Sequence, residues 1–320
     1  MNIYTENFNE QTLITFEEGS FKVVFSTLGA SFVDIKSGKD HLIYSPVDKN
    51  DMLAPDFYHG KTIGPICNRI EKGIVYINGK KYVMAPNEGE NTLHGGVNGI
   101  SHKYFTYKID KNENSVTFTY NKKAFEDELP GNVIYTVKYI VKHMEIQLFY
   151  DVTSDEDTII SLTNHVYICL DAKDVKKISF QAPCDTYVVP RKEDLIALNV
   201  EKVPYYLDFN QTTCFGDNLY LDILQNSRTK GFDHNLIFKK GLERHIVSVE
   251  DNKYKMFIES NYPSVQIYTD NYEDQHPFID INLKKHGSVA IEPCDIITER
   301  PILRKDEHYL RNIIYSIKEK

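Results

Sequence analysis

Hydrophobic and polar residues alternate with a period of two along much of this chain, the pattern of strands with one buried face. In residues 115–120, Val116, Phe118 and Tyr120 share one face. Residues 132–151 alternate similarly and predict two strands. Residues 74–83 read IVYINGKKYV, two strand-like runs around Asn78-Gly79, a strong hairpin signal. Further strands are predicted at 177–182, 244–250, 255–260 and 264–269.

Helical periodicity is scarce. The pattern predicts one short turn of helix near 122–128 and leaves 214–225 unassigned. There is no βαβ rhythm, GxGxxG or GxxxxGK[ST] sequence, and no repeat, low-complexity linker or break in composition. Many short strands separated by Gly, Pro, Asn and Asp predict an all-β protein of antiparallel sheets packed face to face. We therefore expect a single domain over residues 1–320.

The composition agrees with a folded protein and narrows its partners. The 320 residues are 41% hydrophobic and 26% charged, enough for a large core, with 22 Tyr, 17 Phe and no Trp. The net charge is −9 without a block of Lys and Arg, so nucleic acid is not an expected partner. The polar N-terminus does not resemble a signal peptide, and no apolar run approaches the roughly 18 residues of a membrane helix. Five scattered cysteines without a CxxC pair favour reduced thiols and a cytoplasmic location.

A carboxylate at the end of an apolar strand is the most unusual feature of the sequence. In SVAIEPCD, residues 288–295, Val289, Ala290 and Ile291 lead directly into Glu292. Glu is rarely buried unless it is paired. Partial burial would raise its pKa towards neutrality and make it a candidate general base. The alternative is a Glu exposed by strand alternation.

Four other polar residues stand in stretches that suggest a pocket, although each also has an ordinary explanation. Arg69 in GPICNRIEKG could form a surface ion pair or bind an oxygen-rich ligand. His94 precedes Gly95-Gly96, which suits either a plain turn or a pocket edge. His165 in SLTNHVYICL would by itself usually be a satisfied core histidine. Asp233 in GFDHNLIF could simply bond its own backbone in a turn.

Two other kinds of chemistry find little support in the local sequence. His94, His165, His234 and Glu292 are possible metal ligands, but none has HExxH-like or CxxC spacing. A Ser-His-Asp hydrolase would usually show a GxSxG elbow, which is missing. We therefore expect no metal site and no nucleotide or redox cofactor.

The order of the motifs is more specific than any single motif. CNRIEKGIVYINGKKYVMAPNEGENTLHGG resembles the aldose 1-epimerase (galactose mutarotase) family almost continuously. DELPGNVIYTVKY, LTNHVYICL, GFDHNLIF, VQIYTDN and AIEPCD are similar to later landmarks of that family, in the same order. The resemblance runs from about Gly29 to the C-terminus. It implies a large antiparallel β-sandwich, the galactose mutarotase-like supersandwich, that binds a hexose in a groove across one sheet.

The resemblance also implies roles for individual residues. Arg69, His94, His165, Asp233 and Glu292 fall on sugar-binding and catalytic positions of the family. We assign Glu292 as base and His165 as acid, and expect the nearby carboxylate to favour the charged, proton-donating form of His165. Arg69 and His94 would bond near the ring oxygen, and Asp233 would accept bonds from sugar hydroxyls. Asn68 and Tyr167 complete the expected binding residues.

The chain departs from the family pattern at Ile168-Cys169 and at Cys294, where the family often has Gln. These departures leave the preferred sugar open. The expected activity is interconversion of the α and β anomers of a free hexose such as galactose or glucose, by a monomer or homodimer. A non-catalytic sugar-binding module, a hexose-6-phosphate epimerase of the same fold and a glycosidase are the alternatives.

Overall fold

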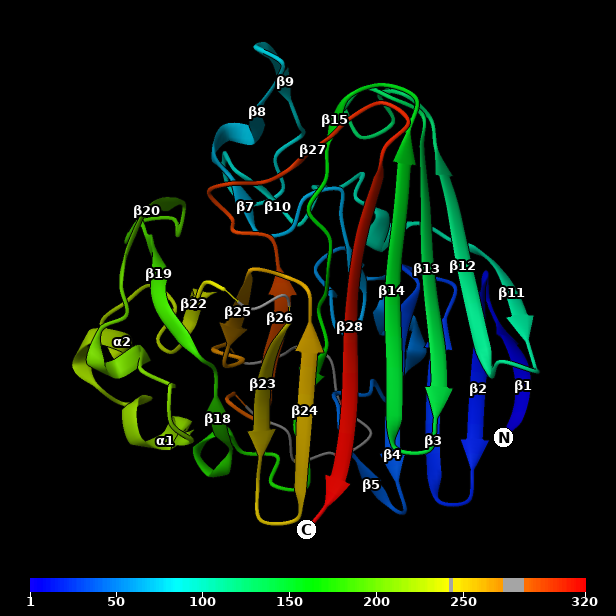
Figure 1. Cartoon of the computed structure of the whole chain (residues 1–320), viewed down its shortest axis with the longest axis vertical. Helices are drawn as coiled ribbons and strands as arrows, with labels where there is room; N and C mark the ends of the chain where they lie inside the picture. The colour runs from blue at the N-terminus through cyan, green and yellow to red at the C-terminus, as the bar shows by residue number, and fades with distance from the viewer. Residues whose placement is uncertain (242–243, 273–284) are drawn as a thin grey trace.

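The chain folds into antiparallel sheets that pack face to face, as Figure 1 shows for the computed structural model. The structure describes residues 1–241, 244–272 and 285–320. Within these ranges every pair of strands is antiparallel. The all-β prediction is confirmed. The nine-stranded sheet has the order β11 (Thr106–Asp110), β12 (Ser115–Lys122), β13 (Val133–Lys142), β14 (Glu145–Ser154), β28 (His308–Glu319), β24 (Tyr254–Ser260), β23 (His245–Glu250), β18 (Ser179–Gln181) and β21 (Thr213–Cys214).

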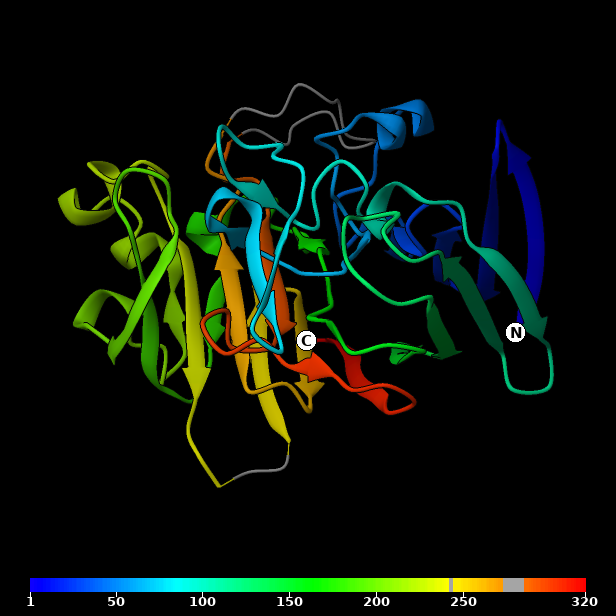
Figure 2. The same cartoon turned by 90° about the horizontal axis from the view of Figure 1, so that it is seen from above.

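Two smaller sheets lie against the nine-stranded sheet. The five-stranded sheet joins β1 (Asn2–Phe8), β2 (Gln11–Glu18), β3 (Phe21–Ser26), β4 (Ser31–Ser37) and β5 (Asp40–His41). The six-stranded sheet has the order β17 (Tyr167–Ile168), β26 (Val289–Cys294), β25 (Ser264–Tyr268), β22 (Asp233–Phe238), β19 (Cys184–Pro190) and β20 (Ala197–Lys202). Figure 2 shows the N-terminal strands in blue at one end of the molecule and β19 and β20 in green at the other.

Short elements connect these sheets. Four two-stranded pairs are β7 (Arg69–Ile70) with β10 (Thr92–Leu93), β8 (Ile74–Ile77) with β9 (Lys80–Val83), β15 (Thr158–Ile159) with β27 (Ile302–Leu303), and β16 (Thr163–Asn164) with β6 (Thr62–Ile63). The helices are one turn each: α1 (Phe215–Asn218), α2 (Asp222–Gln225) and 3₁₀ turns at Lys49–Leu53, Glu71–Gly73, Ile100–His102, Val175–Lys177 and Tyr205–Leu207.

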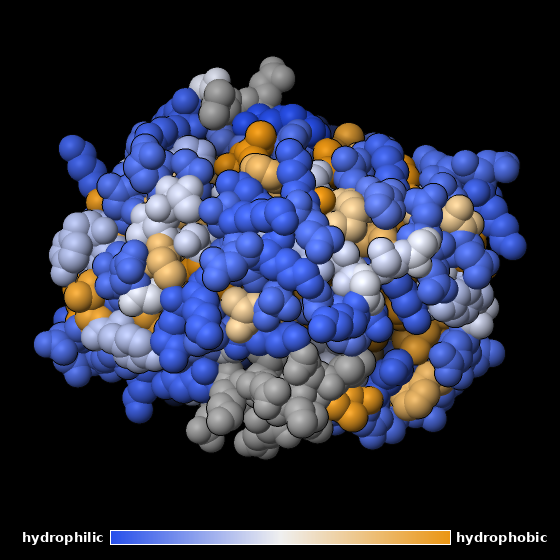
Figure 3. Space-filling view, turned by 90° about the horizontal axis from the view of Figure 1, so that it is seen from below, coloured by the Kyte–Doolittle hydropathy of each residue, from blue (hydrophilic) through white to orange (hydrophobic). Residues whose placement is uncertain are grey.

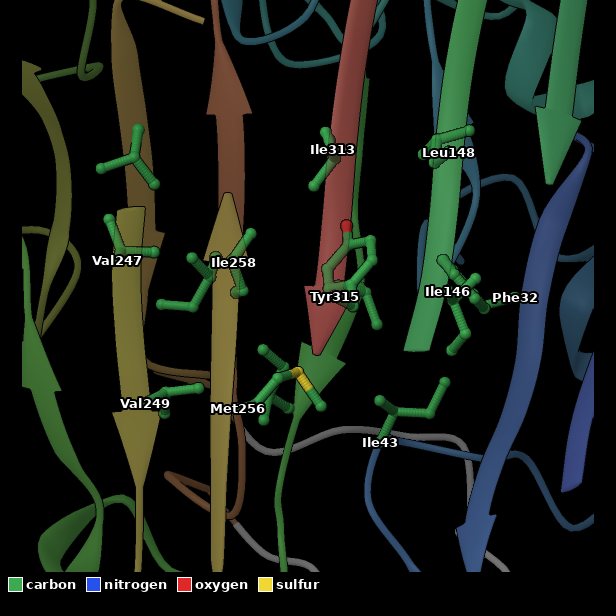
Figure 4. Packing of buried hydrophobic residues seen from close by; sticks show 14 of the residues in the cluster. Phe32, Ile43, Ile146, Leu148, Val247, Val249, Met256, Ile258, Ile313 and Tyr315 are labelled. Atoms are coloured by element: carbon green, nitrogen blue, oxygen red, sulfur yellow. The ribbon is translucent and has the colours of Figure 1, made fainter. Parts of the chain in front are cut away.

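The main core lies between the nine-stranded sheet and the two smaller sheets. Alternate residues of β14, from Ile146 to Val152, point into it because strand side chains alternate between faces. Phe32 of β4 meets Tyr139 and Tyr315 edge-on, with ring centroids 5.0 and 5.6 Å apart. Figure 4 shows Phe32 opposite Ile146 and Tyr315 of the large sheet. The face of the molecule in Figure 3 is mostly hydrophilic, with apolar residues scattered over it.

The predicted strands appear close to their expected positions. The hairpin at 74–83 is β8 and β9, and 132–151 contains β13 and most of β14. The helix predicted near 122–128 is wrong. Lys122 still belongs to β12, and its ammonium binds the carboxylate of Asp127 at 2.7 Å, so the chain folds back as a series of turns. The unassigned stretch 214–225 contains the two short α-helices.

Candidate active site

Three neighbouring strands place polar side chains on the face of the six-stranded sheet that points away from the core. On β26, Val289 and Ile291 face the core, so Glu292 faces the opposite side. The register pairs Glu292 with Gln266 of β25, and Asp233 of β22 pairs with Tyr268 of β25. Antiparallel pairing therefore brings residues from three distant parts of the sequence to one surface.

Asn68 and His94 are locked together above this surface. Both have left-handed backbones, with φ of 61° and 54°, in the two segments that join at β7 and β10. The backbone N–H of Asn68 donates to Nδ1 of His94 at 3.3 Å, and the backbone N–H of His94 donates to the backbone carbonyl of Asn68 at 3.1 Å. Because Nδ1 accepts a bond, the proton of neutral His94 belongs on Nε2. Burial lowers the pKa of His94 well below its usual value, and the nearby His165 and Arg69 add to this effect.

The backbone around His165 is fixed by the segment before β6. The His165 amide donates to the Lys61 carbonyl at 3.0 Å, and its carbonyl accepts from Gly60 at 2.8 Å. The fully buried Asn164 donates to the Gly60 carbonyl at 3.0 Å. Asn164 therefore positions the strand, whereas the Tyr167 ring stacks on His165 at 5.0 Å.

His165 and Glu292 form the closest acid–base pair of the site. Nε2 of His165 lies 3.5 Å from Oε1 of Glu292, and the two residues are only 5% and 3% exposed. Burial raises the pKa of Glu292 well above its usual value; the charges of Cys67 and Asp233 raise it further, and Arg69 opposes them. A raised pKa at Glu292 was expected from its apolar strand.

The expected charge of His165 is wrong. Its pKa is lowered to about 3, chiefly by burial and then by His59. Loss of hydration on burial disfavours the charged imidazole, so His165 is neutral near pH 7 in the free protein. Both shifts therefore favour the pair with its proton on Glu292 and none on His165.

A second polar network holds Arg69 and Asp233. Arg69 binds Glu88 through Nε at 2.7 Å and Nη2 at 2.9 Å, and its Nη1 lies 3.7 Å from Asp233. Gln266 donates to Asp233 at 2.6 Å and accepts from Asn68 at 3.2 Å. Burial raises the pKa of Asp233 although Arg69 opposes the rise. Arg69 thus forms an ion pair, which was one of its two expected roles, but the pair lies in the wall of a cleft.

These groups line a cleft of about 480 Å³, a size suited to a small molecule. All seven residues expected from the sequence lie there: Asn68, Arg69, His94, His165, Tyr167, Asp233 and Glu292. The remaining lining residues are Asp56, Tyr58, Glu88, Leu93, Leu195, Arg228, Gln266, Tyr268 and Tyr272.

Gln266 and Glu88 are the main residues that the sequence analysis missed. Gln266 lies in VQIYTDN and Glu88 in NEGENTLHGG, both already noted as landmarks. The signal for Gln266 is its register, since it stands opposite Glu292. Glu88 is identified only by its bidentate contact with Arg69, and that contact can be seen only once the folded structure is known.

In the part of the chain that the structure describes, no group of three or more His, Cys, Asp or Glu side chains is placed to hold a metal ion. None of the helices found there is long and apolar enough to cross a membrane. None of the five cysteines, all of which lie in the described ranges, forms a disulfide.

The chain belongs to the aldose 1-epimerase family, whose family model matches residues 12–316. The human protein named galactose mutarotase is 31% identical over 242 residues, which cover 72% of this chain and 66% of the human protein, just under two thirds of its length. The Escherichia coli aldose 1-epimerase is 26% identical over 237 residues, or 71% of this chain and 67% of that protein.

Solved structures agree on the fold. Galactose 1-epimerase from Lactobacillus acidophilus superposes with a TM-score of 0.87 at 20% identity, covering 99% of this chain and 98% of the other. A GalM/aldose epimerase homologue from C. elegans gives 0.85 at 22% identity, covering 97% and 99%. The predicted galactose mutarotase-like sandwich is therefore confirmed.

Proposed function

We propose that this protein is a mutarotase that interconverts the α and β anomers of a free aldohexose. The single observation that carries the proposal is the buried His165–Glu292 pair, 3.5 Å apart at the cleft surface. Ring opening requires removal of a proton from the C1 hydroxyl and delivery of one to the ring oxygen. A closely spaced acid and base, one protonated and the other deprotonated, suits this exchange.

The pair can complete the cycle with one proton. When Glu292 is ionised and His165 is protonated, Glu292 accepts the C1 hydroxyl proton and His165 donates to the ring oxygen. The ring opens, and the proton of the pair is now on Glu292. Rotation about C1–C2 then allows ring closure on the other face, in which Glu292 returns a proton to the C1 oxygen and His165 accepts one from the C5 hydroxyl. In the free protein the pKa shifts favour the second of these arrangements, so a proton has to move from Glu292 to His165, 3.5 Å away, before a closed ring can open.

The surrounding groups would orient the sugar. Neutral His94 offers an Nε2 proton, and the Arg69 guanidinium offers donors, so both can bind the ring oxygen and stabilise negative charge that develops there. The Asp233 carboxylate would accept bonds from hydroxyls. Tyr58, Tyr268 and Tyr272 add aromatic surface for the sugar C–H groups.

The charge of the cleft supports a neutral sugar over a hexose phosphate. Apart from Glu292, where the pKa shift favours the neutral form, three acidic side chains and two basic ones line it: Asp56, Glu88 and Asp233 against Arg69 and Arg228. Arg69 is already engaged by Glu88, and Arg228 donates to the Glu193 carbonyl at 2.8 Å. A phosphate dianion would meet repulsion from these carboxylates, and the two arginines in the described lining already have partners.

The activity can be tested with freshly dissolved α-glucose and α-galactose, followed by optical rotation or one-dimensional NMR. The wild-type protein should reach the anomeric equilibrium faster than buffer, and Glu292→Gln should not. If the wild-type rate equals the buffer rate for a panel of aldoses while the sugars bind, the protein is a binding module. Release of nitrophenol from nitrophenyl glycosides would instead indicate a glycosidase.

A further inference from the structure

Two of the five cysteines, far apart in the sequence, meet beside the candidate base. Cys294 is two residues from Glu292 on β26 and therefore shares its face of the sheet. Cys67 directly precedes Asn68, which lines the cleft. Both cysteines belong to one small buried cluster with Ile63, Val188 and Ile297, and each thiol is the neighbour that shifts the pKa of the other most strongly.

Polar neighbours fix the positions of both sulfur atoms. Sγ of Cys67 lies 3.3 Å from Oγ of Ser161. Sγ of Cys294 accepts from Nδ2 of Asn235 at 3.2 Å and lies 3.5 Å from Oγ of Ser264. The two thiols of the cluster therefore come from two segments that are each anchored.

The two thiols have different environments. The hydrogen bond with Cys294, the bond with Ser161 and the charge of Arg300 together hold the pKa of Cys67 below its usual value despite burial. Nη2 of Arg300 also donates to the carbonyls of Cys67 and Arg69, which keeps its charge nearby. The pKa of Cys294 is raised well above its usual value by the bond with Cys67 and by burial. Cys67 is thus the nucleophile of the pair, because the thiolate is the reactive form.

A small cavity lies between the cleft wall and the cysteine cluster. A cavity of about 10 Å³, enough for about one water-sized molecule, shares Asn68, Asp233 and Gln266 with the cleft wall. Its inner wall includes Asn235, which bonds Cys294, and Val188 and Ile297, which belong to the cysteine cluster. This cavity therefore adjoins both the sugar cleft and the cysteine cluster.

We propose that Cys67 and Cys294 form a reversible disulfide when the protein meets a hydroperoxide, and that this bond disables the sugar site. The Cys67 thiolate attacks the O–O bond of hydrogen peroxide and gives a sulfenic acid and hydroxide, which takes up a proton to become water. The Cys294 thiol then attacks the Cys67 sulfur, forming the S–S bond and releasing the second water. Two thiols and one peroxide yield one disulfide and two waters.

The disulfide reaches the site through the backbone on both sides. An S–S bond requires about 2.05 Å between sulfur atoms, much less than any thiol hydrogen bond. Closing that gap displaces Cys67 with Asn68, and Cys294 with Glu292. A shift of about 1 Å in a reacting group is enough to cost about a hundredfold in rate. The loss of activity rests on the proposed function, whereas formation of the disulfide does not.

The test treats the intact wild-type protein with hydrogen peroxide, alkylates the remaining thiols and maps the peptides by mass spectrometry. The expected result is a Cys67–Cys294 cross-link, lighter than the separate peptides by two hydrogen atoms, with the other three cysteines alkylated. Mutarotation should fall by about a hundredfold and return after dithiothreitol. Cys294→Ser should give no cross-link and leave Cys67 as a sulfenic acid that dimedone captures once the oxidised protein is unfolded. Cys214→Ser, which removes the most exposed thiol, should behave as wild type.

Several results would overturn the proposal. One is a wild-type protein that keeps all five thiols under peroxide in its folded state. Others are a cross-link that uses Cys214, or the same loss of activity in Cys294→Ser as in wild type. The wild-type peptide map decides the question even if a variant does not fold. A protein that forms the cross-link but has no activity before oxidation contradicts the proposed function alone.

Discussion

The two faces of strands β22, β25 and β26 differ completely although they alternate residue by residue. One face carries Leu236, Ile267 and Ile291 into the main core. The other carries Asn235, Gln266 and Glu292 towards the cleft and the cysteine pair. Both faces are buried, so burial alone does not separate stability from function. The polar face retains a carboxyl group that would be costly in a core, as expected where a site rather than packing decides the residue.

Glu292→Gln tests the polar face and should have the largest effect. The amide has nearly the same shape but cannot accept the C1 proton, so we expect kcat to fall roughly 10²–10⁴-fold. The melting temperature should remain the same or rise, because an ionisable group leaves a buried site. Polarimetry gives the rate and calorimetry the stability. Unchanged turnover would exclude Glu292 as the base.

Leu236→Ala tests the apolar face of the same sheet. Truncation of this fully buried side chain leaves a cavity and should lower the free energy of unfolding by about 2–5 kcal/mol. Urea unfolding followed by circular dichroism measures this change. The control is Ile246→Ala on β23, half-exposed, which should change stability by less than about 0.5 kcal/mol. Equal losses in the two variants would contradict the assignment of the faces.

Gln266→Ala tests a bridging residue beside the core residue Ile267. The substitution removes the bonds to Asp233 and Asn68 and leaves buried polar groups unpaired, at about 1–3 kcal/mol. We expect KM to rise roughly tenfold, with a smaller loss of stability than in Leu236→Ala. Initial rates over a range of galactose and glucose concentrations separate KM from kcat. A change in stability without any change in KM would make Gln266 a structural residue only.

A change of pH should alter turnover less than any of these substitutions. It tests whether the polar face of the sheet is as desolvated at His165 as the pKa shifts indicate. The pair works with one proton, so activity is lost as the pH falls through the lowered pKa of His165, near 3. It is also lost as the pH rises through the raised pKa of Glu292. Turnover should therefore not decrease when the pH is lowered from about 6.5 to 5, after correction for the buffer reaction. A decrease with an apparent pKa at the ordinary histidine value would show that His165 is not desolvated as described.

Alternation was sufficient to predict the strands and the antiparallel class, and the apolar run before Glu292 singled out that residue, since each depends on a local pattern. The residues brought together from different strands depend on register, which local patterns do not specify. Gln266 was therefore missed although it stands directly opposite Glu292. The prediction of a helix at 122–128 was wrong because the Lys122–Asp127 contact overrides the local helical preference. The predicted positive charge of His165 was wrong for a related reason. Motifs can indicate a neighbouring carboxylate, but they do not show how far the imidazole is desolvated.

The cleft also bears on how the chain must fold. Arg69 and Asp233 meet across it, and β28 at the C-terminus lies between β14 and β24 in the sheet behind it. The Arg69–Asp233 pair and the pairing of β28 with β14 join segments far apart in sequence, and such a topology is associated with slow folding. A partly synthesised or partly refolded chain lacks one wall of the cleft until its last strands are placed. Recovery of sugar turnover during refolding should therefore follow completion of the β-sheets rather than collapse of the core.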